Sequence, residues 1–196
     1  MDIQKINWKF FVEDPVHAAP DIFFKVFNTW IPDDPEIFVD VADYQHVHDG
    51  PLIALVGYYT DYWLDTTDRR VGLLYNRRLP MEGTNGEKLG SSFREILQAC
   101  VRLQNDPEFK GRLRFRKDEF LFIINDRGIA PNTKETFDVV RPELESILDG
   151  VYGKNQYSVE HLNHPKQRFS VKIIVKQSPE IESLIQRLPA AQKARA

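Results

Sequence analysis

Apolar side chains recur at every second position near the start of the chain. Ile6, Trp8, Phe10 and Val12 alternate with mostly polar neighbours, a spacing that is typical of a β-strand. The same alternation predicts a strand at 169–175. Apolar runs between turn-forming residues predict further strands at 37–41, 52–64, 71–75, 113–115, 120–124 and 157–162. We expect 52–64 to bend at Gly57, and 113–115 and 120–124 to form a hairpin.

Apolar residues spaced three or four apart predict helices between these strands. The clearest stripe runs through 89–101, and shorter helices are expected at 22–30 and after Asn132, which has Glu135 at capping-box spacing. Residues 79–90, rich in glycine and proline, are predicted to form a surface loop. A last amphipathic helix begins at Pro179.

This order of elements predicts an α+β fold, mostly an antiparallel sheet with helices packed on one face. From Val71 onward the predicted order is strand, helix, strand, strand, helix, strand, which is ferredoxin-like, with one extra short strand near Tyr157. We expect residues 1–176 to form a single domain, followed at 177–196 by the amphipathic helix and a frayed tail.

Two segments that precede predicted helices echo each other. The matched positions are Phe11, Asp14, Ala19 and Pro20 in the first segment and Phe122, Asn125, Ala130 and Pro131 in the second. Four matches are compatible with an internal duplication and equally with chance.

Composition narrows the class of protein. The 196 residues are 42% hydrophobic, enough to fill a core, so a disordered chain is not expected. A net charge of −3 argues against a nucleic-acid partner. Cys100 is the single cysteine, which excludes a disulfide framework and fits a cytoplasmic location. No apolar run approaches the roughly 20 residues of a membrane helix, and no signal-peptide pattern opens the chain.

A pair of histidines suggests a metal site. His46 and His48 project from one face if this segment is extended, and Asp43 lies close to them in the sequence. Imidazole nitrogens and a carboxylate suit a divalent metal such as zinc or iron. The alternative is a pair of solvent-facing loop histidines before a Gly-Pro turn. A joint site with His161 and His164 is a further possibility.

The aromatic segment around residue 60 suggests a binding face. Alternation places Tyr59, Asp61, Trp63 and Asp65 on one side of a strand. Such an aromatic and acidic surface suits a flat ligand, a cation or a protein partner. The alternative is that this surface binds no ligand and is instead covered by a helix or a second subunit.

Polar residues at one strand end form another candidate. Asp126 and Arg127 follow an apolar strand directly, where ligands often bind, although the same residues also make a good structural turn. Arg112, Arg114 and Arg116 could line an RNA-reading sheet or simply a solvated outer face; the glycine and aromatic signature of RNA-reading sheets is absent.

These observations leave two functional hypotheses. The first is a non-catalytic ligand-binding, partner-binding or assembly module, homo-oligomeric, using its aromatic sheet face or its C-terminal helix. The second is a metal-dependent enzyme with His46 and His48 as ligands and a bound water as nucleophile. The chain contains no nucleophile elbow and no glycine-rich phosphate loop.

Three segments resemble a group of uncharacterised bacterial proteins. They are HVHDGP at 46–51, GLLYNRR at 72–78 and NDRGIAPN at 125–132. The resemblance extends over most of the chain but implies no activity, ligand or catalytic residue.

Overall fold

A single antiparallel sheet of eight strands runs through the computed structural model, which describes residues 1–47, 50–164 and 166–189. The strand order is β2-β3-β4-β5-β1-β6-β8-β7. The strands are β1 (Ile6–Val12), β2 (Phe38–Asp43), β3 (Pro51–Gly57), β4 (Thr60–Asp65), β5 (Gly72–Arg77), β6 (Phe115–Ile124), β7 (Tyr157–His161) and β8 (Phe169–Val175). The first strand therefore lies inside the sheet, and β2 and β7 form its two edges.

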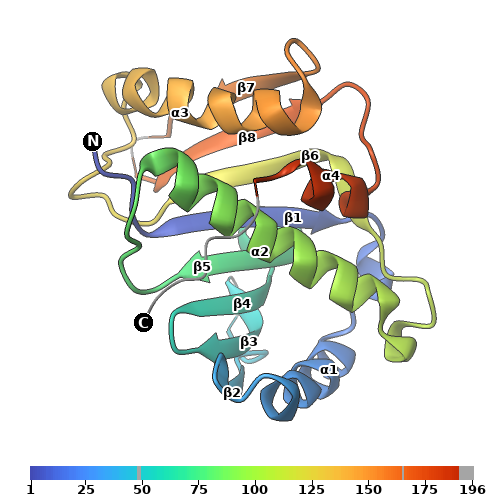
Figure 1. Ribbon diagram of the computed structural model, residues 1–196. Coiled ribbons are helices and arrows are strands. Elements are labelled where there is room, and N and C mark those ends of the chain that lie inside the picture. The colour runs from blue at the N-terminus through green and yellow to red at the C-terminus, as the bar shows by residue number, and fades with distance from the viewer. Residues whose placement is uncertain (48–49, 165, 190–196) are drawn as a thin grey trace.

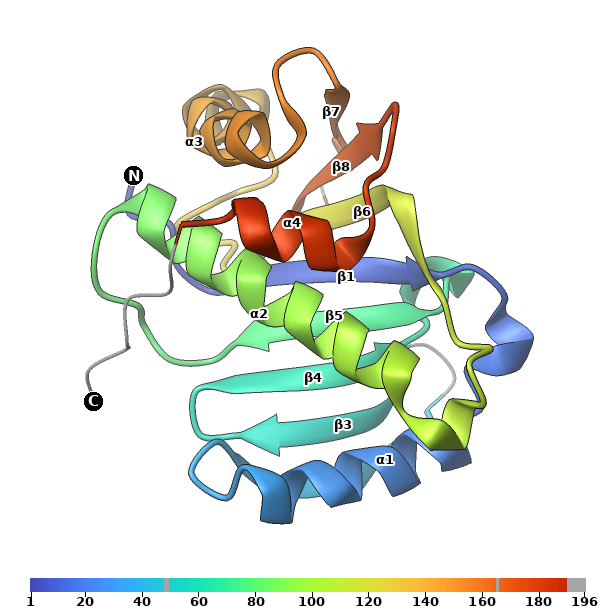
Figure 2. The same cartoon turned by 45° about the vertical axis from the view of Figure 1, so that its right-hand side comes forward.

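Four α-helices lie on the same face of this sheet (Figures 1 and 2). They are α1 (Pro20–Asp33), α2 (Asn85–Asn105), α3 (Lys134–Tyr152) and α4 (Ile181–Arg187). Short 3-10 turns lie before α1 at Pro15–His17, between β4 and β5 at Thr67–Arg69, and after α2 at Pro107–Phe109. α2 crosses β1 and β5, α1 contacts β2 and β3, and α3 contacts β7. The predicted α+β class with helices on one face is confirmed. None of the described helices is long and apolar enough to span a membrane.

The core lies between the helices and the sheet because the strands alternate as predicted. Trp8 and Phe10 of β1 point toward α2, where the ring of Phe93 lies 4.8 Å from that of Trp8. Phe120 of β6 stacks on Phe10 at 4.7 Å between ring centroids. Such aromatic packing buries large apolar areas and supplies most of the stabilisation of the layer.

The residues between these core positions along the strands point to the opposite side of the sheet, which we call the helix-free face. Its central side chains are Asn7, Lys9 and Phe11 of β1, Leu74 and Asn76 of β5, and Asp61, Trp63 and Asp65 of β4.

One predicted hairpin and one predicted bent strand differ from the structure. Residues 113–124 were expected to form two strands, but β6 is one strand, with a register shift opposite Phe10 and Val12 that absorbs its extra residues. From β5 onward the order is therefore strand, helix, strand, helix, strand, strand, and the ferredoxin-like order is not seen. Residues 52–64 are not one bent strand but the hairpin of β3 and β4. A Cβ at Gly57 would lie 2.3 Å from Thr60 O, so the tight turn requires glycine there.

Two helix starts also differ from expectation. α2 begins at Asn85, inside the predicted loop, because Thr84 and Glu87 form a reciprocal capping box. The cap of α3 is Thr133, whose side chain accepts from the Thr136 N–H, rather than Asn132.

The C-terminal helix packs onto the body of the protein. Ile181 and Leu184 of α4 are buried, and the helix contacts α2 and α3. Arg94 of α2 fixes its end by donating to Ile185 O at 3.0 Å and Leu188 O at 2.6 Å. The apolar stripe that suggested a free docking helix is thus covered by the chain itself, and the predicted frayed tail at 190–196 lies outside the described residues.

β1 and β6 lie side by side, and each leads through an aspartate turn into a helix. Asp14 and Asp126 each accept a hydrogen bond at 3.0 Å from the backbone N–H two residues later. Ala18 and Ala130, placed equally after the two aspartates, are both buried. The echo in the sequence thus has a geometric counterpart, but Asp14 matches Asp126 rather than Asn125, one position from the predicted alignment.

Candidate functional site on the helix-free face

The predicted binding residues are only partly brought together. Asp61 and Trp63 do project from β4 onto the helix-free face, Asp61 buried and Trp63 half-buried. Tyr59 does not, because it belongs to the β3–β4 turn, where alternation no longer applies. It is 43% exposed, and the guanidinium of Arg77 lies 5.5 Å from its ring centroid.

Asp61 begins a row of three polar side chains that crosses adjacent strands. It pairs in register with Asn76 of β5, which pairs with Asn7 of β1. Asn76 Nδ2 donates to Asp61 Oδ2 at 3.1 Å, and Asn7 Nδ2 donates to Asn76 Oδ1 at 2.8 Å. All three are at most 9% exposed, and Asn7 Oδ1 is buried with no hydrogen-bond partner. Such chains of buried hydrogen bonds fix the side chains in one arrangement.

The carboxylate of Asp61 sits in a protected position. Its Oδ1 accepts from the Gly57 N–H at 3.2 Å, and Arg78 NH1 lies 3.5 Å from the same oxygen. Burial raises the pKa of Asp61, while these donors act in the opposite direction. A backbone N–H and a more distant guanidinium thus hold the carboxylate of Asp61, which makes no short ion pair.

A buried ion pair lies beside this row. Lys9 Nζ is 2.5 Å from Asp65 Oδ2, and the two side chains are 3% and 4% exposed. Thr67 orients the carboxylate by donating its hydroxyl to Asp65 Oδ1 at 2.8 Å. Burial lowers the pKa of Lys9, and the charge of Asp65 opposes this shift. Because both ions are desolvated, each depends on the other.

Two further ion pairs lie on this face, whereas the exposed Asp40 of β2, in register with Val56, makes no ion pair with the described residues. Arg70 lies 3.5 Å above the ring of Phe11 and contacts Glu119 at 2.5 Å. Lys172 contacts Glu160 at 2.6 Å. Positive and negative groups thus pair with each other across the part of the face from β4 to β7.

Sequence reasoning missed most of these residues. Asn7 and Lys9 of β1 and Asn76 of β5 were not named as site residues, and Asp65 of β4 was placed on the aromatic and acidic face without being named as a ligand-binding residue. The available signal was their position: each is a polar residue within a strand that is otherwise buried.

The predicted metal site is not assembled by the described residues. Asp43 Oδ1 accepts from the Gln45 N–H at 2.8 Å, and His46 is exposed. His48 lies outside the described residues, and within 1–47, 50–164 and 166–189 no three His, Cys, Asp or Glu side chains could hold a metal ion. A joint site with His161 is wrong, because His46 follows β2 and His161 ends β7, at opposite edges of the sheet. A site that includes His48 stays a prediction.

The strand-end candidate serves as a turn. Asp126 Oδ1 accepts from the backbone N–H groups of Gly128 and Ile129 at 3.0 and 3.1 Å. This is the alternative that the sequence offered for Asp126 and Arg127. Arg127 is exposed on the same turn.

A second polar cluster lies on the helix side, between α2 and strands β4 and β5. Glu95 accepts long hydrogen bonds from Ser91 at 3.3 Å and Thr60 at 3.5 Å. The hydroxyl of Tyr75 is buried and unpartnered, and that of Tyr62 donates to Glu95 O at 3.4 Å. Burial raises the pKa of Glu95. This carboxylate is therefore poorly solvated and weakly hydrogen bonded.

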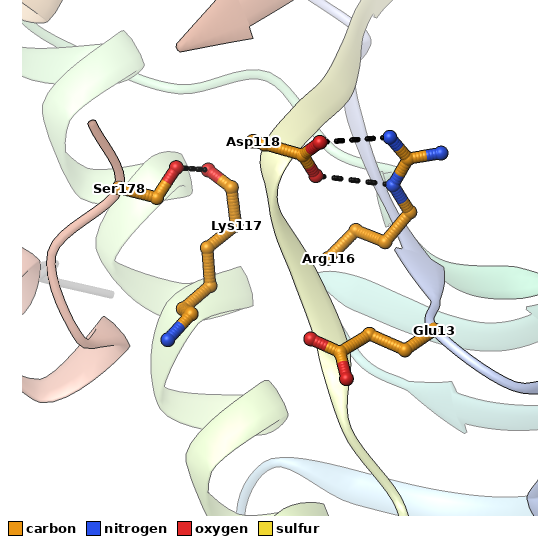
Figure 3. A pocket seen from close by; sticks show the side chains of 5 residues that line it. All are labelled: Glu13, Arg116, Lys117, Asp118 and Ser178. Atoms are coloured by element: carbon orange, nitrogen blue, oxygen red, sulfur yellow. Dashed lines mark hydrogen bonds and ion pairs between the residues drawn. The ribbon is translucent and has the colours of Figure 1, made fainter. Parts of the chain in front are cut away.

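A shallow hollow of about 440 Å³ opens near the start of β6 (Figure 3). Arg116 makes a bidentate pair with Asp118 at 2.8 and 3.0 Å, and Lys117 contacts Glu180 at 2.6 Å. Ser178 donates its hydroxyl to Lys117 O at 2.6 Å. The polar groups around the hollow thus bond to one another. In ligand pockets, by contrast, polar groups converge on the centre of the pocket.

Comparison with known proteins adds no homologue. No family model matches the chain, and no curated protein matches it. The features that bear on function are therefore those of the helix-free face.

Proposed function

We propose that the protein is a non-catalytic assembly module that forms a homodimer by packing the helix-free faces of two copies together. The observation that supports this proposal is the internal pairing of the charges from β4 to β7 on that face. An identical copy brings the same set of paired charges, so neither partner leaves these ions uncompensated at the interface.

The dimensions of the face suit such a contact. Eight strands spaced about 4.8 Å apart span about 38 Å, and six residues of a strand extend about 20 Å. The product, roughly 750 Å², is the projected area of the whole face. Lys9, Phe11 and Leu74 at its centre are at most 3% exposed already, so the area that a dimer buries comes from the half-buried and exposed side chains around them.

Apolar side chains flank the central polar row. Val56 and Trp63 lie on one side of it, half-buried, and Leu121 and Ile174 lie on the other. Ile174 is 41% exposed, the largest exposed fraction among these four. In a two-fold contact these flanks meet apolar counterparts and provide the hydrophobic part of the stabilisation.

Light scattering on the full chain tests the proposal. Ile174→Asp places a charge in the interface and should shift the mass distribution toward smaller species. Phe24→Asp on α1 is the matched control, since Phe24 is 38% exposed and lies on the other side of the sheet. A wild-type chain that stays monomeric at high concentration, or an Ile174→Asp variant with unchanged mass, contradicts the proposal.

Trp63 provides an independent readout. Trp8 and Trp30 are 0% and 2% exposed, whereas Trp63 is half-buried. When the protein is diluted until the dimer dissociates, Trp63 should become exposed to water. Its fluorescence emission should then shift to longer wavelength. In a Trp63→Phe variant this concentration-dependent shift should disappear.

A further inference from the structure

The two edges of the sheet differ in how they treat their outward backbone groups. At β2, Tyr44 N donates inward to Leu52 O at 2.8 Å, so Val41 points its N–H away from the sheet. That N–H donates to Asp40 Oδ1 at 2.8 Å. The Gln45 N–H, outward as well and lying beyond the outward N–H of Asp43, donates to the side chain of Asp43. Carboxylates thus accept the hydrogen bonds of the outward N–H groups of Val41 and Gln45. Charged side chains on an edge strand are a known way to prevent the addition of another strand.

Among the described residues, no side chain accepts from the outward N–H groups of β7, although the C=O of His161 accepts from the Asn163 N–H at 3.0 Å. Leu162 N donates to Ser170 O at 2.9 Å, and Lys176 N donates to Gln156 O at 2.8 Å, so even-numbered residues bond inward to β8. Tyr157, Val159 and His161 therefore direct their N–H and C=O groups outward. β7 is the outermost strand on its side of the sheet, with α3 over its helix side (Figures 1 and 2).

We infer that β7 pairs antiparallel with β7 of a second copy, with Val159 opposite Val159, so that two sheets become one. In this register the outward-facing residues of the two copies lie opposite each other. Tyr157 of each copy lies opposite His161 of the other, so hydrogen-bonded pairs form on both sides of Val159. The contact is separate from the face-to-face dimer proposed above and does not depend on it.

Side chains agree with this register. Ser158 of one copy lies opposite Glu160 of the other, so no two like charges are directly opposed. Each Glu160 already contacts Lys172 of its own chain at 2.6 Å. The strand is also held in place, because the Tyr157 hydroxyl donates to Asp149 Oδ1 of α3 at 2.8 Å. A preformed strand loses little conformational entropy on pairing.

Val159→Pro tests the edge contact. Proline removes the outward N–H and its ring blocks strand addition, but the inward bonds of β7 are made by other residues, so the monomer should keep its fold. Val159→Thr is the matched control, because it keeps the N–H and the β-branched side chain.

Light scattering of the full chain separates this contact from the face contact. Ile174→Asp should still form a dimer through β7, and adding Val159→Pro should halve its mass, whereas adding Val159→Thr should not. An Ile174→Asp chain that is monomeric, or whose mass Val159→Pro leaves unchanged, overturns the edge inference and leaves the face proposal standing.

Hydrogen exchange covers the case in which Val159→Pro does not fold. In the Ile174→Asp chain, exchange at the amides of Val159 and His161 should slow at least tenfold as concentration is raised through dimer formation. Unchanged exchange at these amides overturns the inference.

Discussion

The ammonium of Lys9 reaches the carboxylate of Asp65 by crossing Gly72 on the strand between them. Gly72 lies in register with Asp65, and a Cβ built on it would lie 3.1 Å from Lys9 Cε and 2.5 Å from Phe10 O. The absence of a side chain at this position lets two strands that are not neighbours share an ion pair at 2.5 Å.

The buried ion pair should be strongly coupled. Lys9→Met leaves Asp65 charged and unpaired, and we expect it to lower the free energy of unfolding by about 3–5 kcal/mol. Lys9→Met combined with Asp65→Asn should lose less than the sum of the single changes, by about 1–3 kcal/mol. Urea denaturation of the four proteins measures this, and strict additivity would refute the coupling.

Gly72→Ala should destabilise the sheet. The new methyl group meets a backbone oxygen that cannot move without disturbing β1, and overpacking of this kind costs about 1–3 kcal/mol. Gly86→Ala is the control: no atom lies within 4 Å of its Cβ position, and alanine favours the first turn of α2. Thermal unfolding should move down for Gly72→Ala and stay level or rise for Gly86→Ala.

Glu95 should make stability depend on pH. Because its pKa is raised in the folded state, the folded protein binds more protons there, and stability falls as pH rises from the unfolded pKa through the folded pKa. Glu95→Gln should therefore raise the thermal midpoint at pH 7 and change it little at about pH 4, below the ordinary glutamate value. Glu82→Gln, at an exposed position, should show no such difference between the two pH values.

Asn132 should anchor the segment that follows β7. Its Nδ2 donates to Leu162 O and His164 O at 3.0 Å, and its Oδ1 lies 2.7 Å from His161 Nε2. Asn132→Ala removes all three contacts, while Leu162 O and His164 O each keep a backbone donor at 2.9 Å, and we expect a loss of about 1 kcal/mol in unfolding free energy. Asn163→Ala, nearby but exposed, should be nearly neutral; equal losses in urea denaturation would show that Asn132 has no special role.

Local patterns in the sequence predicted the layers of this fold but not its pairing. Alternation in β1 and β8 and the stripe of α2 depend on neighbouring residues, so they could be read directly. Within 113–124, one strand replaces the two that were predicted because this segment pairs with β1, about a hundred residues earlier in the chain. The start of α2 was predictable, because Thr84 and Glu87 have capping-box spacing in the sequence.

The binding face was predictable only where alternation holds. Asp61 and Trp63 lie on the side of β4 that their spacing indicates, whereas Tyr59 falls in a turn that was taken for strand. The partners of Asp61 could not be inferred, because Asn76 and Asn7 reach it only through the register of β4, β5 and β1. Side-chain networks across strands need the sheet order, which local spacing does not contain.

The position of β1 also sets the order in which the protein can fold. β1 leaves the ribosome first, yet it lies between β5, which ends at Arg77, and β6, which ends at Ile124. Until β6 has been synthesised, one side of β1 has no strand to bond to, and a nascent chain that ends before Phe115 presents an open, aromatic-rich edge at β1. The centre of the finished sheet is thus an unprotected edge during part of translation.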